Sequence, residues 1–313
     1  MAKPVKWMEG VACEAAVRKG ASKILASRLK RVIASLPMAA TQREDIEHVH
    51  RLRVATRRTM TALKLFRKFL LARALKGLRK TLKRIQKVAG EARDLDVLML
   101  GLTKSRHAGK QGMALALLKE RKGVQRELKE LYWDLRKGKS LKKQADKLIK
   151  QVRKCKQGKA KQAFGPWGQK QLREVSQRFF EAAPQDTGDL KQLHRFRIRG
   201  KELRYTLELV ASGGPAALRT KVYPEMEQLQ EKLGAIHDSL VAMKRMERLS
   251  EDEKRSSLRP FAVATAKRES ARLKRQVKAF GRWWTPKKAK EMQRLLTSVK
   301  RSRPVKKRTS SSE

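Results

Sequence analysis

The sequence contains an internal repeat in which residue i corresponds to residue i+144. The string HRLRV that begins at His50 aligns with the string HRFRI that begins at His194. About forty residues further on, with no gap, Gly90 aligns with Gly234, and several of their neighbours align too. Two separate blocks rarely keep one offset by chance, even among basic helices. The repeat therefore predicts a duplicated fold with two similar halves related by a pseudo-twofold axis.

Each half is predicted to be helical throughout. Ala, Leu, Lys, Arg, Glu and Gln dominate, Pro and Gly fall where helices would end, and no run alternates like a strand. The expected fold class is all-α, with long helices packed as bundles. The predicted helices span about 9–36, 43–71, 73–89, 92–107, 109–137, 140–157, 167–182, 188–212, 216–235, 238–250 and 252–281.

One domain is expected over residues 1–285, and it contains both halves. The N-terminal half is predicted over about 9–137, a linking helix over about 138–160, and the C-terminal half over about 161–285. The basic tail, 286–313, is predicted to be disordered, because its end has almost nothing apolar to bury.

The charge of the chain restricts the classes of partner. Lys and Arg number 79 against 30 Asp and Glu, a net charge of +49, so a polyanion is the expected partner. Aromatic residues make up only 5% of the chain, which disfavours base stacking on single-stranded nucleic acid. Cys13 and Cys155 are interpreted as reduced thiols, and no apolar stretch is long enough for a membrane helix, so a cytoplasmic protein without membrane insertion is expected.

Two helices are predicted to carry one-signed cationic faces. At about 100° per residue, Arg53, Arg57 and Lys64 lie within about 60° of His50. In the second half one face holds His194, Arg197, Lys201, Arg204 and Tyr205. A linear polyanion laid along such a face meets a donor at each turn, and Arg binds phosphate oxygens bidentately. Glu208 lies near the second face and is expected to orient a neighbouring Arg or Tyr205.

A third basic row precedes Gly90. Arg79, Lys83 and Lys87 follow helical spacing there, and whether they face the binding groove or bulk solvent stays open at this point. Asp94 and Asp238 are interpreted as acids at helix starts or as partners of basic residues. No metal site is predicted, because each half offers few clustered acids.

These segments resemble the CHAD domains, the conserved-histidine α-helical domains. The resemblance rests on two histidine-led segments, 50–58 and 194–208, and on 90–97, which is similar to the family's Gly-x-x-Arg-Asp-x-Asp-Val element. In the second copy of that element His237 replaces Arg93 and Leu240 replaces Asp96, so the two copies need not share a role. The resemblance covers about 9–283.

The resemblance implies two four-helix bundles around a pseudo-twofold axis, with a basic cavity or groove between them. It also implies binding of inorganic polyphosphate, association with polyphosphate granules, and no catalysis. The residues that it marks for binding are His50, Arg53, Arg57, Arg58, His194, Arg197, Lys201, Arg204 and Tyr205. Proteins of the granule are a further partner that the sequence leaves open.

The main alternative is a nucleic-acid-binding or nucleoid-associated protein, which the net charge would equally support. The sequence shows no helix-turn-helix or RNA-binding signature, which favours polyphosphate. It also has no phosphate-binding GxxxxGK[ST] loop, no HExxH pair and no recognisable catalytic triad. An enzyme is therefore not expected, and neither is a cofactor.

Overall fold

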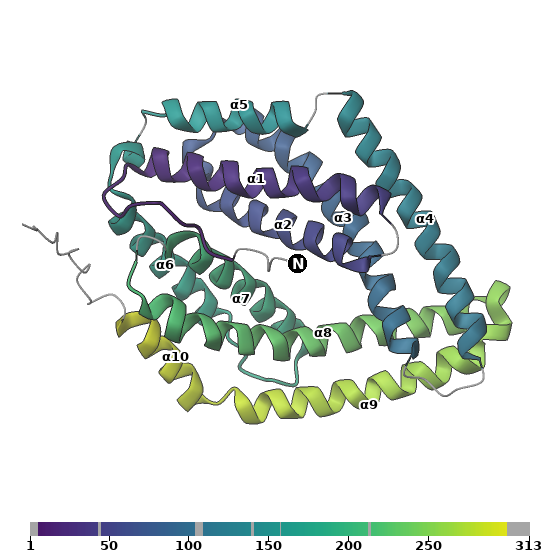
Figure 1. Ribbon diagram of the computed structural model, residues 1–313. Coiled ribbons are helices and arrows are strands. Elements are labelled where there is room, and N and C mark those ends of the chain that lie inside the picture. The colour runs from purple at the N-terminus through teal and green to yellow at the C-terminus, as the bar shows by residue number, and fades with distance from the viewer. Residues whose placement is uncertain are drawn as a thin grey trace, which may run out of the picture. The chain divides into compact units, whose positions relative to one another are not determined.

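The protein is all-α, as predicted. The computed structural model describes residues 6–42, 45–103, 109–138, 141–156, 158–211 and 214–298, and these residues contain no strand. The helices are α1 (Val17–Thr41), α2 (Ile46–Leu65), α3 (Ala72–Thr103), α4 (Lys110–Lys137), α5 (Leu141–Lys154), α6 (Phe164–Glu181), α7 (Leu190–Val210), α8 (Tyr223–Glu251), α9 (Arg259–Trp283) and α10 (Pro286–Ser298) (Figure 1).

The chain divides into two compact units. Unit 1 contains Ala16–Lys161 and Gly234–Val277, and unit 2 contains the described residues of Val5–Ala15, Gln162–Leu233 and Lys278–Glu313. This division differs from the predicted contiguous halves. Val5–Ala15 joins unit 2, although it precedes unit 1 in sequence, and Gly234–Val277 joins unit 1, although it follows unit 2. The boundary at Leu233 falls inside α8, whose 29 residues span about 44 Å. The duplication itself stays a prediction from the repeat.

Two predicted helix breaks are wrong. α3 continues through residues 90–91 and α8 continues through residues 236–237, where breaks were expected. A glycine inside a helix lowers stability by only about 1 kcal/mol relative to alanine. Burial of one face of α3, where Leu82, Ile85 and Ala89 are fully buried, outweighs that loss.

The two ends of the chain also differ from the prediction. Residues 9–16, expected to begin the first helix, precede α1. The tail expected to be disordered from residue 286 forms α10 as far as Ser298, because Met292 and Leu296 are four residues apart and both are buried. The rest of that tail lies outside the described residues.

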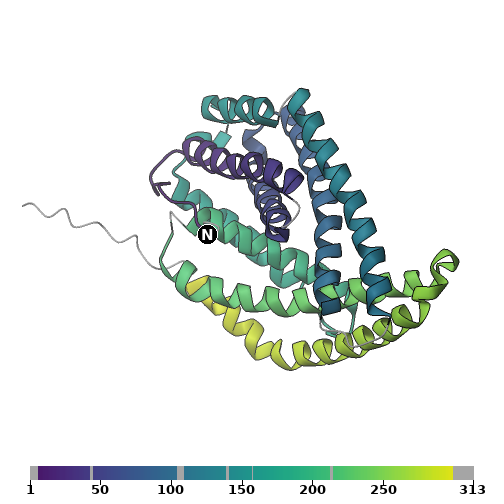
Figure 2. The same ribbon diagram turned by 45° about the vertical axis from the view of Figure 1, so that its right-hand side comes forward.

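Unit 1 is built around α1. This helix packs on α2, α4 and α5, while α3 packs on α2, α4 and α5. Figures 1 and 2 both show α3 and α4 running side by side. The core between these helices is aliphatic, with Leu25, Leu29, Leu52, Leu63 and Leu128 all inaccessible to solvent. The amphipathic periodicity thus gives each helix a buried stripe and leaves its cationic side outward.

Unit 2 has an aromatic core. The ring of Phe196 on α7 stacks on Phe179 of α6 at a centroid distance of 4.6 Å and contacts Trp284 at 4.8 Å. α10 packs on α6 and on the π-helical turn Leu218–Val222 that precedes α8. These contacts bury one side of α7 and fix the direction in which its polar side faces.

An extended N-terminal segment also belongs to unit 2. The backbone N–H groups of Phe164 and Gly165 donate to the carbonyls of Ala15 and Cys13, each at 2.8 Å. A Cβ atom at position 165 would clash with Sγ of Cys13, so this close approach favours glycine. The segment ends against α8, where the ring centroids of Trp7 and Tyr223 are 4.6 Å apart.

No helix in the described part of the chain combines the length and the apolar character needed to span a bilayer.

Candidate anion-binding site

The first predicted cationic face lies on α2, in unit 1. Asp45 caps this helix by accepting a hydrogen bond from the backbone of Glu47 at 2.8 Å. The buried side of α2 carries the leucines of the core, so the opposite side is left to the predicted cations. His50, Arg53 and Arg57 are half-buried there, and Lys64 is exposed. We call His50, Arg53, Arg57 and Lys64 the α2 row.

Arg53 connects the α2 row to α3. Its Nη1 donates to Oδ1 of Asp94 at 2.8 Å and to the carbonyl of Gly90 at 3.3 Å. Asp94 is therefore a partner of a basic residue, one of the two predicted roles, and it lies inside α3 rather than at a helix start. The motif that begins at His50 thus contacts the motif that begins at Gly90, about forty residues further along the chain.

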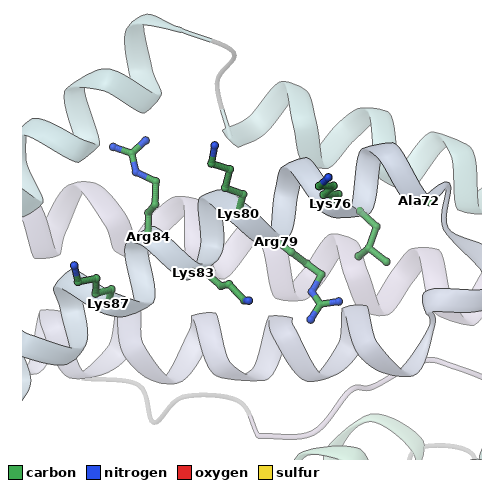
Figure 3. Close-up of a pocket in the computed structure, with 8 residues that line it drawn as sticks. Ala72, Lys76, Arg79, Lys80, Lys83, Arg84 and Lys87 are labelled. Atoms are coloured by element: carbon green, nitrogen blue, oxygen red, sulfur yellow. The ribbon is translucent and has the colours of Figure 1, made fainter.

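The basic row before Gly90 lies on the same side of α3 as Asp94. At about 100° per residue, Arg79, Lys83 and Lys87 all fall within about 60° of Asp94. They help line a hollow of about 680 Å³ along α3 (Figure 3), and we call Arg79, Lys83 and Lys87 the α3 row. The lining residues are Ala72, Leu75, Lys76, Arg79, Lys80, Lys83, Arg84 and Lys87. Figure 3 shows Arg79 and Lys83 pointing to one side of the helix and Lys80 and Arg84 to the other.

A second, smaller pocket lies between α1 and α2. Its volume is about 200 Å³, and we call it the α1–α2 pocket. The lining residues are Arg28, Arg31, Ser35, His50, Arg51, Val54, Ala55 and Arg58. Arg58, predicted as a binding residue, is here and only 6% exposed. Sequence reasoning missed Arg28 and Arg31, because α1 carries no histidine-led motif and their spacing of three is common on any helix.

His50 stands at the edge of this pocket in a positive potential. Burial lowers the pKa of its imidazole first, and Arg93 lowers it further, while Glu47 acts in the opposite direction. Arg57 and Arg53 add smaller effects that also lower the pKa. The imidazole is therefore neutral at neutral pH, and an arriving polyanion would raise its pKa.

The second predicted face lies on α7, in unit 2. His194 is exposed, and Arg197 and Lys201 are half-buried beside it. Partial burial, then Arg197 and Lys201, lower the pKa of His194. The α7 side thus has the same character as the α2 row, with a neutral histidine beside fixed positive charges. We call His194, Arg197, Lys201 and Arg204 the α7 row.

Arg204 is held in place by a buried network. Its Nη1 donates to the hydroxyl of Tyr223 at 3.2 Å, and that hydroxyl donates to Oε1 of Glu208 at 2.7 Å. Glu208 is fully buried and lies 3.9 Å from Arg204, so the predicted orientation of an arginine by Glu208 agrees with this contact. Burial, followed by the charge of Glu208, raises the pKa of Tyr223 well above its ordinary value.

Tyr205 differs from the other residues proposed for binding. It is only 4% exposed, and the guanidinium of Arg204 lies 4.7 Å from its ring centroid. The ring therefore stabilises the position of the Arg204 guanidinium through a cation–π contact.

The motif acid Asp96 has a structural partner. Its Oδ1 accepts from Nε of Arg121 at 2.7 Å, and Nη1 of Arg121 donates to Oε1 of Gln125 at 2.7 Å. Nε2 of Gln125 then donates to the carbonyls of Ala39 and Ala40, at 2.9 and 2.8 Å. These two carbonyls are among the last four of α1, which have no partner within the helix. Asp96 thus fixes α4 and the end of α1 to α3.

Asp96 and the other acids form no metal site in the described residues, where no group of three His, Cys, Asp or Glu side chains converges. The α2 and α3 rows and the α1–α2 pocket belong to unit 1, and the α7 row belongs to unit 2. The shared groove that the resemblance implied stays a prediction.

The protein is therefore an all-helical basic protein. Its helices α2 and α7 each carry a row of cations that begins with a histidine. The CHAD domain model matches residues 23–247, and the chain belongs to the CHAD domain family. No curated protein matches the chain.

Solved structures show the same fold. The crystal structure of the CHAD domain from the plant Ricinus communis superposes with a TM-score of 0.74 at 19% identity, covering 95% of this chain and 97% of that one. PptA from Streptomyces chartreusis has a TM-score of 0.58 at 14% identity, with 92% and 100% covered. At these identities the likeness is one of fold.

Proposed function

We propose that this protein binds inorganic polyphosphate along its cationic helix rows. The observation that carries the proposal is the contact of Arg53 with Gly90 and Asp94, which brings the α2 row beside the α3 row. Membership of the CHAD domain family supports the same ligand. An extended phosphate chain laid along these rows meets a guanidinium or ammonium group at each helical turn.

The rows favour a phosphate chain over a nucleic acid. They consist of Arg, Lys and His, which bind phosphate oxygens, and the α2 and α3 rows contain no aromatic side chain on which a base could stack. The +49 charge alone would attract any polyanion. Specificity is therefore the property to measure, and duplex DNA is the competitor to use.

The site variant should remove charge while keeping the ion pairs of Arg53 and Arg204. Arg53 and Arg204 are kept, because they pair with Asp94 and Glu208. The variant replaces Arg57, Lys64, Lys83 and Lys87 with Gln. The control variant replaces four exposed lysines of α4 and α5, namely Lys119, Lys122, Lys129 and Lys142, with Gln. Both variants lose the same net charge.

Affinity for long-chain polyphosphate is measured at several salt concentrations, with duplex DNA of equal total charge as competitor. We expect the site variant to bind at least tenfold more weakly than the control variant, with a smaller dependence on salt, because fewer counterions are released. Equal losses in the two variants would contradict a localised site. Displacement of polyphosphate by DNA at equal charge would favour the nucleic-acid function.

The proposal includes binding without catalysis. Polyphosphate incubated with the protein should keep its chain length, and release of orthophosphate would contradict this. The same affinity would bring the protein to polyphosphate granules in the cytoplasm. A fluorescent fusion should therefore coincide with stained granules, and the site variant should be spread through the cell.

A further inference from the structure

One pocket of unit 1 combines apolar side chains with lysines. It lies between the segment 68–71, which precedes α3, and the end of α5 with the residues that follow it, and its volume is about 430 Å³. We call it the lysine pocket. Phe69 and Leu70 are only 8% and 9% exposed, whereas Leu71 beside them is 58% exposed. An exposed leucine next to buried apolar residues offers a contact surface to an apolar group of a partner.

Five of the ten residues that line the lysine pocket are lysines, and all five are exposed. They are Lys68, Lys147, Lys150, Lys154 and Lys156. The ten lining residues, all in the described part of the chain, include no carboxylate. None of these lysines forms an ion pair with another residue that the structure describes. Their charges are therefore accessible to a partner from outside.

Three of the lysines form a row on α5. At about 100° per residue, Lys147, Lys150 and Lys154 lie within about 60° of one another, and at 1.5 Å per residue their row is about 10 Å long. An extended chain rises about 3.3 Å per residue, so about three of its residues span the row. A small amphiphile with one acidic head group would pair with only part of the row. The spacing therefore favours an extended segment that carries several carboxylates.

Other polyelectrolytes match this pocket less well. Polyphosphate can pair with the lysines, but it has no apolar group that would cover Leu71. The pocket also has no arginine among its lining residues, so it lacks the forks that bind phosphate oxygens bidentately on the α2 and α3 rows. A second copy of this chain carries the same net charge of +49 and would be repelled.

We propose that the lysine pocket is a docking site for an acidic, extended segment of a partner protein that carries one large apolar side chain. The apolar side chain packs against Leu71, and the carboxylates before and after it pair with the lysines. None of the residues that line the pocket belongs to the cationic rows. One chain can therefore bind a phosphate polymer and a second protein at the same time.

Two labelled peptides serve as probes for the full chain. Both consist of Asp and Glu except at one central position, which is Leu in the first peptide and Ser in the second. We expect the Leu peptide to bind about tenfold more tightly, the effect of burying part of one apolar side chain. Equal affinity of the two peptides would overturn the inference, because charge alone would then explain the binding.

A pair of leucine variants locates the apolar contact. Leu71→Ser should abolish the difference in affinity between the two peptides. The matched control is Leu115→Ser on α4, because Leu115 is 68% exposed and does not line the pocket, and this variant should keep the difference. If Leu71→Ser keeps the tenfold difference while circular dichroism shows it folded, the lysine pocket is not the docking site.

A pair of lysine variants locates the charges. Lys147→Gln combined with Lys150→Gln should weaken the binding of both peptides. Lys122→Gln combined with Lys129→Gln removes the same charge from exposed positions on α4 and should weaken it less. Equal losses in these two variants would mean that the peptides respond to net charge alone, which contradicts a localised site.

Cys155 reports directly on occupancy, because it lines the pocket and is half-buried. The saturating Leu peptide should slow alkylation of Cys155 by neutral iodoacetamide several-fold. It should leave the rate at Cys13, a half-buried thiol of unit 2, unchanged. Equal protection of Cys155 by long-chain polyphosphate would assign the lysines to the phosphate chain and overturn the inference. Protection by vesicles that contain phosphatidylglycerol, without protection by the peptide, would assign them to a membrane surface and overturn it too.

Discussion

Replacement of Asp96 by Asn should strongly destabilise unit 1. Asp96 is 1% exposed and the side chain of its partner Arg121 is 10% exposed, so the ion pair is well shielded from water. Loss of one partner from a buried pair costs about 3–5 kcal/mol, because the other charge stays buried without compensation. Asn keeps an oxygen that can accept from Nε, which places the expected loss near the lower value, about 3 kcal/mol. That is a large fraction of the 5–15 kcal/mol typical of a domain.

Urea unfolding followed by circular dichroism measures the change in the free energy of unfolding. The matched control is Asp134→Asn on α4, because Asp134 is 70% exposed and lies 4.0 Å from Arg84. Such an exposed pair contributes about 0–1 kcal/mol. The double variant Asp96→Leu with Arg121→Met removes both charges and should recover most of the lost stability.

Hydrogen exchange adds a second measurement. Arg121 also holds Gln125, which donates to the last carbonyls of α1, so Asp96→Asn should increase exchange near the end of α1. The reasoning is refuted if Asp96→Asn destabilises the protein no more than Asp134→Asn does, since the network would then carry no special stability.

Two further predictions concern pH and packing. Burial and Arg93 lower the pKa of His50 below 6.5, and a bound polyanion raises it, so affinity for polyphosphate should rise as the pH falls through the region around 6.5. Without ligand, the free energy of unfolding decreases as the pH falls over the same interval, because the unfolded chain binds the proton more readily than the folded chain. Calorimetry in buffers of different ionisation enthalpy should show proton uptake on binding, and an unchanged uptake in His50→Asn would disprove this role. Gly165→Ala should destabilise unit 2 by about 1–3 kcal/mol in urea unfolding, because its Cβ would clash with Sγ of Cys13, whereas Gly123→Ala, whose Cβ meets nothing within 4 Å, should not.

The helices were largely predictable because helical periodicity is a local property. The prediction of 109–137 agrees closely with α4, Lys110–Lys137. The errors came where a local signal was outweighed by packing. Gly90 looked like a break, but burial along α3 offsets its low helix propensity. Residues 286–298 looked too polar to fold, but α10 needs only a narrow apolar stripe to pack on α6.

The candidate site was predictable only in part. Periodicity placed His50, Arg53 and Arg57 on one side of a helix, and the structure has them there. It could not show that Arg53 bonds to Asp94, because that contact joins residues 41 positions apart. It also could not show that Tyr205 is buried beneath Arg204, since the burial depends on what packs against α7.

The sequence by itself determined the all-α class, the family and the side of each helix that carries the cations. These follow from the period of the helix and from the motif strings, which are properties of neighbouring residues. The tertiary structure alone decided that Arg28 and Arg31 of α1 face His50, and that Gln125 of α4 closes the end of α1. Such pairings depend on how helices that are distant in the chain pack against each other, and packing is settled by the shape of the whole core.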